Sequence, residues 1–229
     1  MARRSSHTGS VTRRRDAEPD ALALLAHELR TPLTALLGYA EAMRDAAFGP
    51  VNPPYDEHAA VIHRAAIQLL ALLDDMTDVA AAEAGVWKGA RERFDAGRLA
   101  HEIVTLFRPR ADAAGIAIRI LIPESLGEVL ADRRAVAQIL TNLLDNALKF
   151  TRRGGAVTLS LAREDHDLRL EVADSGSADG PAFRQPRGHG LGLRLVQALC
   201  MVHGGRLQVE PRPTGGLAAV ARLAVFELG

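Results

Sequence analysis

Two segments in the first half of the chain carry apolar residues at a spacing of three or four, which lines one face of an α-helix. The run from Gly49 to Pro54 separates them and contains three prolines, which cannot continue a helix. The first half is therefore predicted to form an antiparallel hairpin of two helices, with Asp20 capping the first and Gly85 closing the second. The first stripe is Leu22, Leu25, Leu29, Leu33, Leu36, Ala40 and Met43, and the second is Ile62, Ala66, Leu69, Leu73, Met76 and Ala80.

The apolar surface of this hairpin is too large for the two helices alone. Leu70 and Leu72 widen the apolar face of the second helix further. Two copies of the hairpin can bury both stripes in a four-helix bundle, so we expect a homodimer. The alternative is that this surface packs on the second half of the same chain.

From Phe94 onward the pattern changes to short strands alternating with helices. Helices on one face of a mixed sheet predict a two-layer α/β sandwich, so the fold class is a helical hairpin followed by an α/β domain. The expected domains are a disordered basic tail over 1–19, the hairpin over 20–88 and the α/β domain over 89–229. Its helices are expected over 95–114, 132–150 and 191–202, and its strands over 116–122, 157–161, 168–173, 206–210 and 219–226.

Charge and hydropathy exclude some classes of function. Basic and acidic side chains are balanced at 28 each, so the chain has no bulk attraction to nucleic acid. The arginines near the start could contact an acidic partner, as an alternative to a solvated tail. No run approaches the ~18 apolar residues of a membrane span, and we expect a cytoplasmic protein. The single cysteine, Cys200, lies in an apolar run and is expected to be a buried thiol.

The residues around His27 are suited to nucleophilic chemistry. Around the first helix, His27 lies ~160° from the centre of the apolar stripe and Thr31 lies ~40° from His27, so both are expected to face solvent. Glu28 follows directly, and a carboxylate can take the proton of one ring nitrogen while the other attacks. Pro32 lies inside the periodic pattern, where it removes a backbone hydrogen bond and bends the helix.

Three stretches in the second half suit a nucleotide. Asn142, Asn146 and Lys149 share one helical face, and neutral oxygen ligands with one cation suit a Mg²⁺ held mostly by phosphates. The stretch 174–176 (Asp-Ser-Gly) follows a strand, and taken alone it is typical of a plain turn. Glycines at 188, 190 and 192 open the last helix, where backbone amides can approach phosphate oxygens.

Together these stretches resemble a known family. The string His-Glu-Leu-Arg-Thr-Pro-Leu over 27–33 resembles the phosphoacceptor box of the sensor histidine kinases of two-component systems. The later stretches resemble the N box, the Asp-x-Gly motif and the glycine box of their ATP-binding domain. That domain, of the Bergerat type, is shared with type II topoisomerases, chaperones of the ninety-kilodalton class and mismatch-repair ATPases. The resemblance covers about 22–228, nearly the whole chain.

The resemblance implies an ATP-dependent protein histidine kinase that autophosphorylates and passes the phosphoryl group to an aspartate of a response-regulator receiver domain. It implies ATP and Mg²⁺ as cofactors. The implied catalytic residues are His27 as phosphoacceptor, Glu28 as general base and Thr31, which orients water in kinases that also dephosphorylate their partner. The implied nucleotide site consists of Asn142, Asn146 (the Mg²⁺ ligand), Lys149 (phosphate), Asp174 (the adenine amino group), Gly176, Gly188, Gly190 and Gly192.

The chain departs from the family pattern between the last two motifs. The second glycine of the Asp-x-Gly-x-Gly motif is Ala178, and only eleven residues, Ser177 to Arg187, separate Gly176 from Gly188. The usual ATP lid is much longer, and a lid excludes water and positions phosphates. We therefore expect weaker nucleotide retention. The alternative function is a phosphotransfer or scaffold module with a degenerate ATP-binding domain.

Overall fold

The computed structural model describes residues 12–47, 49, 53–176 and 191–225, without the side chains of 12–25, Glu28, Pro53 and Pro54. It consists of two compact units, Met1–Val86 and Trp87–Gly229, which are described separately below. The division falls two residues before the boundary expected from the sequence, because Trp87 belongs with the second unit through the contacts given at the end of this section.

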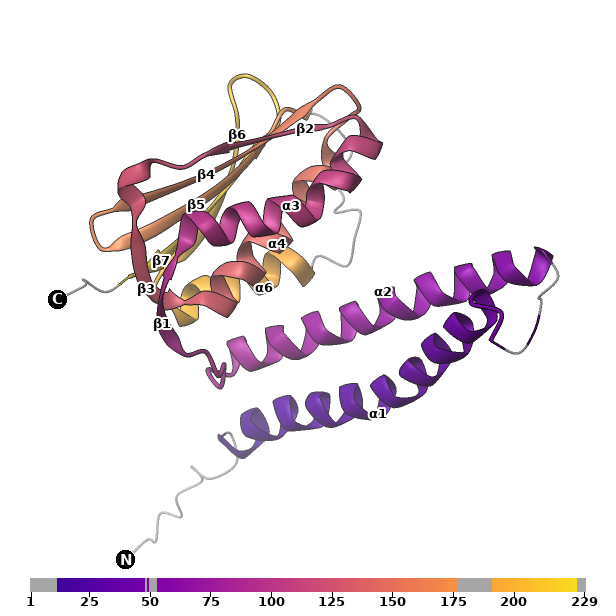
Figure 1. The fold of residues 1–229 in the computed structure, drawn as a ribbon. Helices are drawn as coiled ribbons and strands as arrows, with labels where there is room; N and C mark the ends of the chain where they lie inside the picture. Colours follow the sequence, from indigo (N-terminus) through magenta and orange to yellow (C-terminus); the bar gives the residue numbers. More distant parts are fainter. Residues whose placement is uncertain (1–11, 48, 50–52, 177–190, 226–229) are drawn as a thin grey trace, which may run out of the picture. The chain divides into compact units, whose positions relative to one another are not determined.

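The first unit is an antiparallel hairpin of α1 (Thr12–Arg44) and α2 (Pro53–Glu83) (Figure 1). Arg30 of α1 forms an ion pair with Asp74 of α2. Helix α2 ends at Glu83, and Gly85, two residues later, has a φ of 71° and donates its N–H to the Ala82 carbonyl over 3.1 Å. The hairpin and the role of Gly85 are thus confirmed.

Helix α1 starts earlier than expected. It begins at Thr12, so Asp20 does not cap it, and residues 12–19, expected in the disordered tail, are helical. The sequence from Arg13 to Glu18 contains Arg, Ala and Glu, which favour helix, and extending a formed helix costs little. The helix is continuous through Pro32 and changes direction along its length (Figure 1).

Small side chains dominate the buried part of the hairpin, while large apolar ones are exposed. Among the side chains that the structure describes, the buried residues are Ala26, Ala40, Ala59, Ala66, Val79 and Ala82, whereas the exposed ones include Leu29, Leu36, Val61, Ile62, Ile67, Leu69 and Met76. A single hairpin therefore leaves much of its apolar surface uncovered, as the sequence predicted.

Among the described helices of both units, none is long and apolar enough to cross a membrane.

The second unit is a two-layer α/β sandwich, as expected. A five-stranded sheet has the order β2-β4-β5-β7-β6, in which only the β2–β4 pair is parallel. Helices α3, α4 and α6 cover one face of this sheet (Figure 1). The strands are β2 (Ala117–Leu121), β4 (Ala156–Glu164), β5 (Asp167–Asp174), β6 (Arg206–Pro211) and β7 (Leu217–Ala224), and the helices are α3 (Ala96–Ala114), α4 (Arg133–Phe150) and α6 (Leu191–Val202).

A second sheet was not expected. It pairs β1 (Arg91–Asp95) with β3 (Glu128–Asp132), and the short 3-10 turn η1 (Glu124–Leu126) precedes β3. Strand β1 reads Arg-Glu-Arg-Phe-Asp and buries only Phe94, so it lacks the apolar alternation by which strands are found in a sequence.

Helix α4 forms the centre of the core. Its apolar residues recur every three or four positions, and Ile139, Leu140, Leu143 and Leu144 are almost fully buried. Leucines of β4 and β5 are buried with them. Cys200 of α6 is also fully buried, which confirms the expectation for this thiol, and burial raises its pKa to about 12.

Asp132 connects three parts of this unit. Its Oδ1 accepts the Ala135 N–H over 3.0 Å and so caps α4, while its Oδ2 accepts the Trp87 indole N–H over 2.8 Å. His203, just after α6, places Nε2 3.4 Å from the same Oδ2 without a hydrogen bond among the described residues. Burial lowers the pKa of His203 despite the adjacent carboxylate. Arg134 stacks on the Trp87 ring, 4.6 Å from its centre.

Candidate functional site

His27 lies on the outer side of α1. Its side chain is exposed, as is that of Thr31 one turn later, so the orientation predicted from helical phase is confirmed. The Thr31 hydroxyl donates to the His27 carbonyl over a long 3.4 Å. Arg30, between them, is held by Asp74 across the hairpin. The side chain of Glu28 lies outside the described residues.

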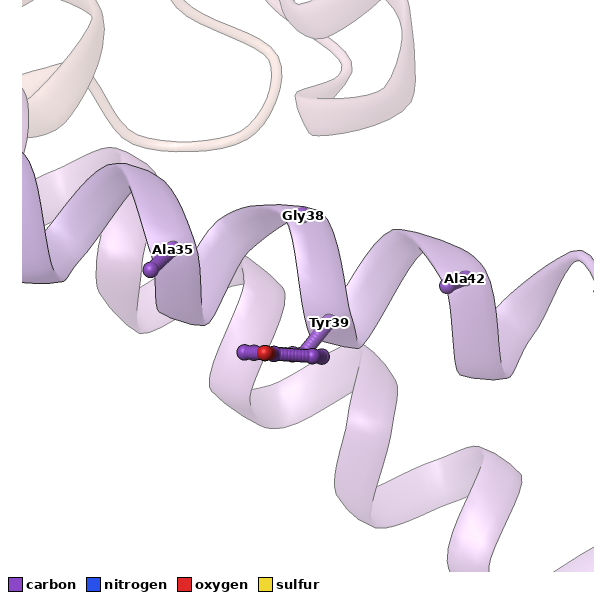
Figure 2. A pocket seen from close by; sticks show the side chains of 4 residues that line it. All are labelled: Ala35, Gly38, Tyr39 and Ala42. Carbon is purple, nitrogen blue, oxygen red and sulfur yellow. The ribbon is translucent and has the colours of Figure 1, made fainter.

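A shallow groove continues along α1 beyond His27. Figure 2 shows its lining by Ala35, Gly38, Tyr39 and Ala42, with the flat Tyr39 ring extending from the helix beside the small residues. Gly38 and Ala42 lie within about 60° of His27 around the helix. A side chain at Gly38 would meet no atom within 4 Å. Gly38 and Ala42 of this groove therefore share a helical face with His27, whereas Ala35 and Tyr39 lie about 80° and 120° away around the helix.

In the second unit, Asn142 and Asn146 meet the start of α6. A Cβ on Gly192 would lie 2.6 Å from Asn142 Oδ1 and 3.6 Å from Asn146 Nδ2, so a larger residue would displace the Asn142 side chain. Asn142 donates to the Gln138 carbonyl over 3.0 Å. The Asn146 side-chain nitrogen is buried and has no hydrogen-bond partner among the described residues. The structure thus brings three of the predicted site residues together.

Lys149 is on the same face but is engaged elsewhere. It forms an ion pair with Asp145, which is also paired with Arg110 of α3. Burial, the largest single influence, raises the pKa of Asp145, but the hydrogen bonds and charges of Lys149 and Arg110 together lower it below its usual value. Lys149 is thus held by Asp145, and its contact with phosphate stays a prediction.

Asp174 is a buried carboxylate held by main-chain donors. It is 7% exposed, its Oδ1 accepts the Gly176 N–H over 2.7 Å, and its Oδ2 accepts the Leu217 N–H over 3.2 Å. Each carboxylate oxygen can accept a further hydrogen bond. A Cβ on Gly176 would lie 3.2 Å from the Phe150 carbonyl, so this turn lies against the end of α4. The carboxylate is therefore oriented before any ligand arrives.

The turn between β6 and β7 contains the glycine pair Gly215 and Gly216, which adds to the resemblance to the ATPase domain but was not predicted to belong to the site. Both have positive φ, 88° and 81°. A Cβ on Gly216 would lie 2.1 Å from the Asp174 carbonyl oxygen. Arg212, at the start of the turn, donates from Nη1 to that oxygen over 3.0 Å. The turn is thus packed directly on the predicted adenine-binding residue.

The donor set is compatible with Mg²⁺ only if phosphates supply most of the ligands. Among the described residues, no group of three or more His, Cys, Asp or Glu side chains could hold a metal ion. Only the side-chain oxygen of Asn146 can serve as a neutral ligand of such a shared site, whereas its unpartnered Nδ2, beside Gly192, is a donor that suits a phosphate oxygen. Gly188, Gly190 and the whole stretch from Ser177 to Arg187, including Ala178, lie outside the described residues.

Family models match both units. Residues 20–85 match the His Kinase A (phospho-acceptor) domain. Residues 131–226 match the histidine kinase-, DNA gyrase B- and HSP90-like ATPase.

Known proteins are similar over most of the chain. The chain is 40% identical over 220 residues to histidine protein kinase DivJ of Caulobacter vibrioides. The aligned region covers 90% of this chain and 37% of that protein. The solved structure of full-length ShkA in complex with AMPPNP has a TM-score of 0.78 and 30% identity, covering 90% of this chain and 46% of that one. The Acinetobacter baumannii histidine kinase AdeS shares the fold, with a TM-score of 0.64 at 23% identity over 88% of this chain and 98% of its own.

The chain spans less than half the length of DivJ and of ShkA. Within that span it contains both the phospho-acceptor hairpin and the ATPase domain, in that order. The chain therefore belongs to the sensor histidine kinase family.

Proposed function

We propose that this protein is an ATP-dependent histidine kinase that phosphorylates its own His27 and passes the phosphoryl group to an aspartate of a response-regulator receiver domain. The observation that carries this proposal is the presence, in one chain, of an exposed helical histidine and a buried carboxylate pre-oriented by main-chain donors. Since ATP is an intracellular substrate, the reaction belongs in the cytoplasm.

The chemistry at His27 requires a ring that two different molecules can reach. In the proposed first step, one ring nitrogen attacks the γ-phosphorus of ATP, the bond to the β–γ bridging oxygen breaks, and ADP leaves. The proton on the other ring nitrogen goes to Glu28. In the second step a receiver carboxylate attacks the phosphorus, the N–P bond breaks, and the ring recovers its proton. The exposure of His27 suits both steps, and Thr31 on the same face would orient water for dephosphorylation.

ATP would bind along α4 and α6. Asp174 would accept a hydrogen bond from the adenine amino group, while Asn142, Gly192 and the other glycines of the last box would surround the phosphates. A Mg²⁺ ion held by Asn146 would neutralise charge on the phosphates. Lys149 would exchange Asp145 for phosphate, and this exchange costs little because the lysine side chain is half exposed. The AMPPNP bound to the related ShkA supports an ATP ligand.

A homodimer would bury the uncovered apolar side chains of the hairpin. The described interior of one hairpin is built mostly of alanines, and its large side chains Leu29, Ile62 and Leu69 stay 43%, 44% and 48% exposed. A four-helix bundle made by two hairpins would cover them. Light scattering should give about twice the mass of 24.5 kDa, and a monomer at micromolar concentration would refute the dimer.

The receiver domain would dock on the groove of Ala35, Gly38, Tyr39 and Ala42, because Gly38 and Ala42 of this groove lie on the same helical face as His27. Gly38→Arg fills open space and should leave the hairpin folded. It is expected to block phosphotransfer to the regulator while autophosphorylation continues. Equal loss of both reactions would place the effect at His27 rather than at docking.

Labelled phosphate tests the main proposal. The purified chain is incubated with Mg²⁺ and γ-labelled ATP, and acid-labile, base-stable label is measured. Wild type and His63→Gln, a control on α2, should be labelled, whereas His27→Gln should not. If wild type stays unlabelled but His27 still takes phosphate from a phosphorylated regulator, the protein is a phosphotransfer module and the kinase proposal fails.

A further inference from the structure

The pairing of β5 with β7 stops one residue before the carboxylate that the proposed function assigns to adenine. Its register ends at Ala173 opposite Ala218. At Asp174, the next residue, the Leu217 N–H donates to the side-chain Oδ2. The Asp174 carbonyl oxygen instead accepts the Arg212 guanidinium over 3.0 Å. A side chain therefore takes the place of a strand neighbour at this carbonyl.

The conformation of the turn that contains Arg212 brings it close to the Asp174 carbonyl. Arg212 N–H donates to the Gly216 carbonyl and Gly215 N–H donates to the Arg212 carbonyl, each over 3.0 Å. Any Cβ at Gly216 would collide with the Asp174 main chain. The turn thus packs against the Asp174 main chain, and the half-buried Arg212 side chain covers the same carbonyl.

We propose that Arg212 is a positioning residue for base recognition: it fixes the Asp174 peptide so that the carboxylate keeps the orientation that selects adenine. This inference rests on the proposed function, since it assumes that Asp174 receives the base. Gly176 N–H, two residues on, orients Oδ1, so a shift of the Asp174 peptide moves both the donor and the carboxylate that it holds.

The consequence is a change in base selectivity rather than in general affinity. Adenine offers an amino group at position 6, which donates to a carboxylate, whereas hypoxanthine presents an oxygen there, which a carboxylate repels. A carboxylate held in one orientation distinguishes the two bases strongly. Once the carbonyl loses its charged donor, the turn can relax and the distinction weakens.

The experiment compares the affinities of the whole chain for ATP and inosine triphosphate, measured by titration calorimetry with Mg²⁺. Arg212→Met should lower the ATP preference by about tenfold, since a hydrogen bond from a charged donor is lost. Arg212→Lys, which keeps a charged donor, should recover much of it. Arg119→Met removes an exposed arginine on β2, at the opposite edge of the sheet, and should leave the preference unchanged.

Two outcomes would overturn the inference: an unchanged preference in Arg212→Met, or equal weakening of both nucleotides, which would mean a merely structural role. Should Arg212→Met not fold, Arg212→Gln, shorter and uncharged, is measured in its place with the same expected loss. The variant Asp174→Asn distinguishes failure of the proposed base site from failure of the proposed role of Arg212. If it leaves the preference intact, the proposed base site itself is wrong; if it abolishes the preference while the Arg212 variants keep it, only the role of Arg212 fails.

Discussion

Replacing Asp132 by alanine should destabilise the second unit strongly, because one carboxylate serves several partners. It caps α4 through the Ala135 N–H and accepts the Trp87 indole N–H, and it is 3% exposed. Loss of a helix cap costs about 1 kcal/mol. Loss of a buried acceptor from the Trp87 N–H costs about 1.5–3 kcal/mol, because the acceptor is charged. We expect the free energy of unfolding to fall by about 3 kcal/mol in Asp132→Ala.

The chain supplies its own probe for this measurement. Trp87 is the only tryptophan, and both tyrosines, Tyr39 and Tyr55, lie in the first unit. Tryptophan emission during urea denaturation therefore follows the second unit. With a denaturant slope of about 2 kcal/mol per molar, a loss of 3 kcal/mol lowers the midpoint by about 1.5 M.

Asp132→Asn is the matched variant. Asparagine can still cap α4 with its oxygen, but its amide nitrogen cannot accept from Trp87. We expect it to lose about half as much stability as Asp132→Ala. Trp87→Phe removes the donor, so in a double-mutant cycle followed by circular dichroism the two changes should be less than additive. A loss below about 0.5 kcal/mol in Asp132→Ala, or full additivity in the cycle, would refute the reasoning.

Three further predictions concern single residues of the second unit. The pKa of His203 is lowered in the folded chain, so at acidic pH the unfolded chain binds a proton there more readily. The free energy of unfolding should therefore fall as pH drops from 7 to 5. His203→Gln should flatten this pH dependence, and an unchanged pH dependence would contradict the prediction. Cys200, fully buried and with its pKa raised to about 12, should react with a thiol reagent only on unfolding, and rapid native labelling would exclude that burial. Gly216→Ala should weaken ATP binding more than tenfold, because the Cβ meets the Asp174 carbonyl at a φ of 81°; unchanged binding would mean that this turn is displaced at no cost.

Much of the architecture was predictable because it is encoded locally. The spacing of Leu22 to Leu36 places His27 on the opposite side of its helix, and the structure finds the ring exposed there. The same spacing located α4 to within one residue at its start. Predictions failed where local signals are weak: β1 has no apolar alternation, and the start of α1 depends on how far a formed helix extends.

The sequence by itself determined the order of the two units, the helical faces of His27 and Asn146, and the motifs that place the chain in its family. Helical periodicity carries that information, because residues three or four apart share a face whatever the rest of the chain does. Only the tertiary structure decided which partners those residues have. Arg212 reaches Asp174 across 38 positions and Trp87 reaches Asp132 across 45, since strand pairing and capping bring distant residues together without any local pattern. For the same reason the sequence identified the carboxylate expected to bind adenine, but not the turn that holds it in place.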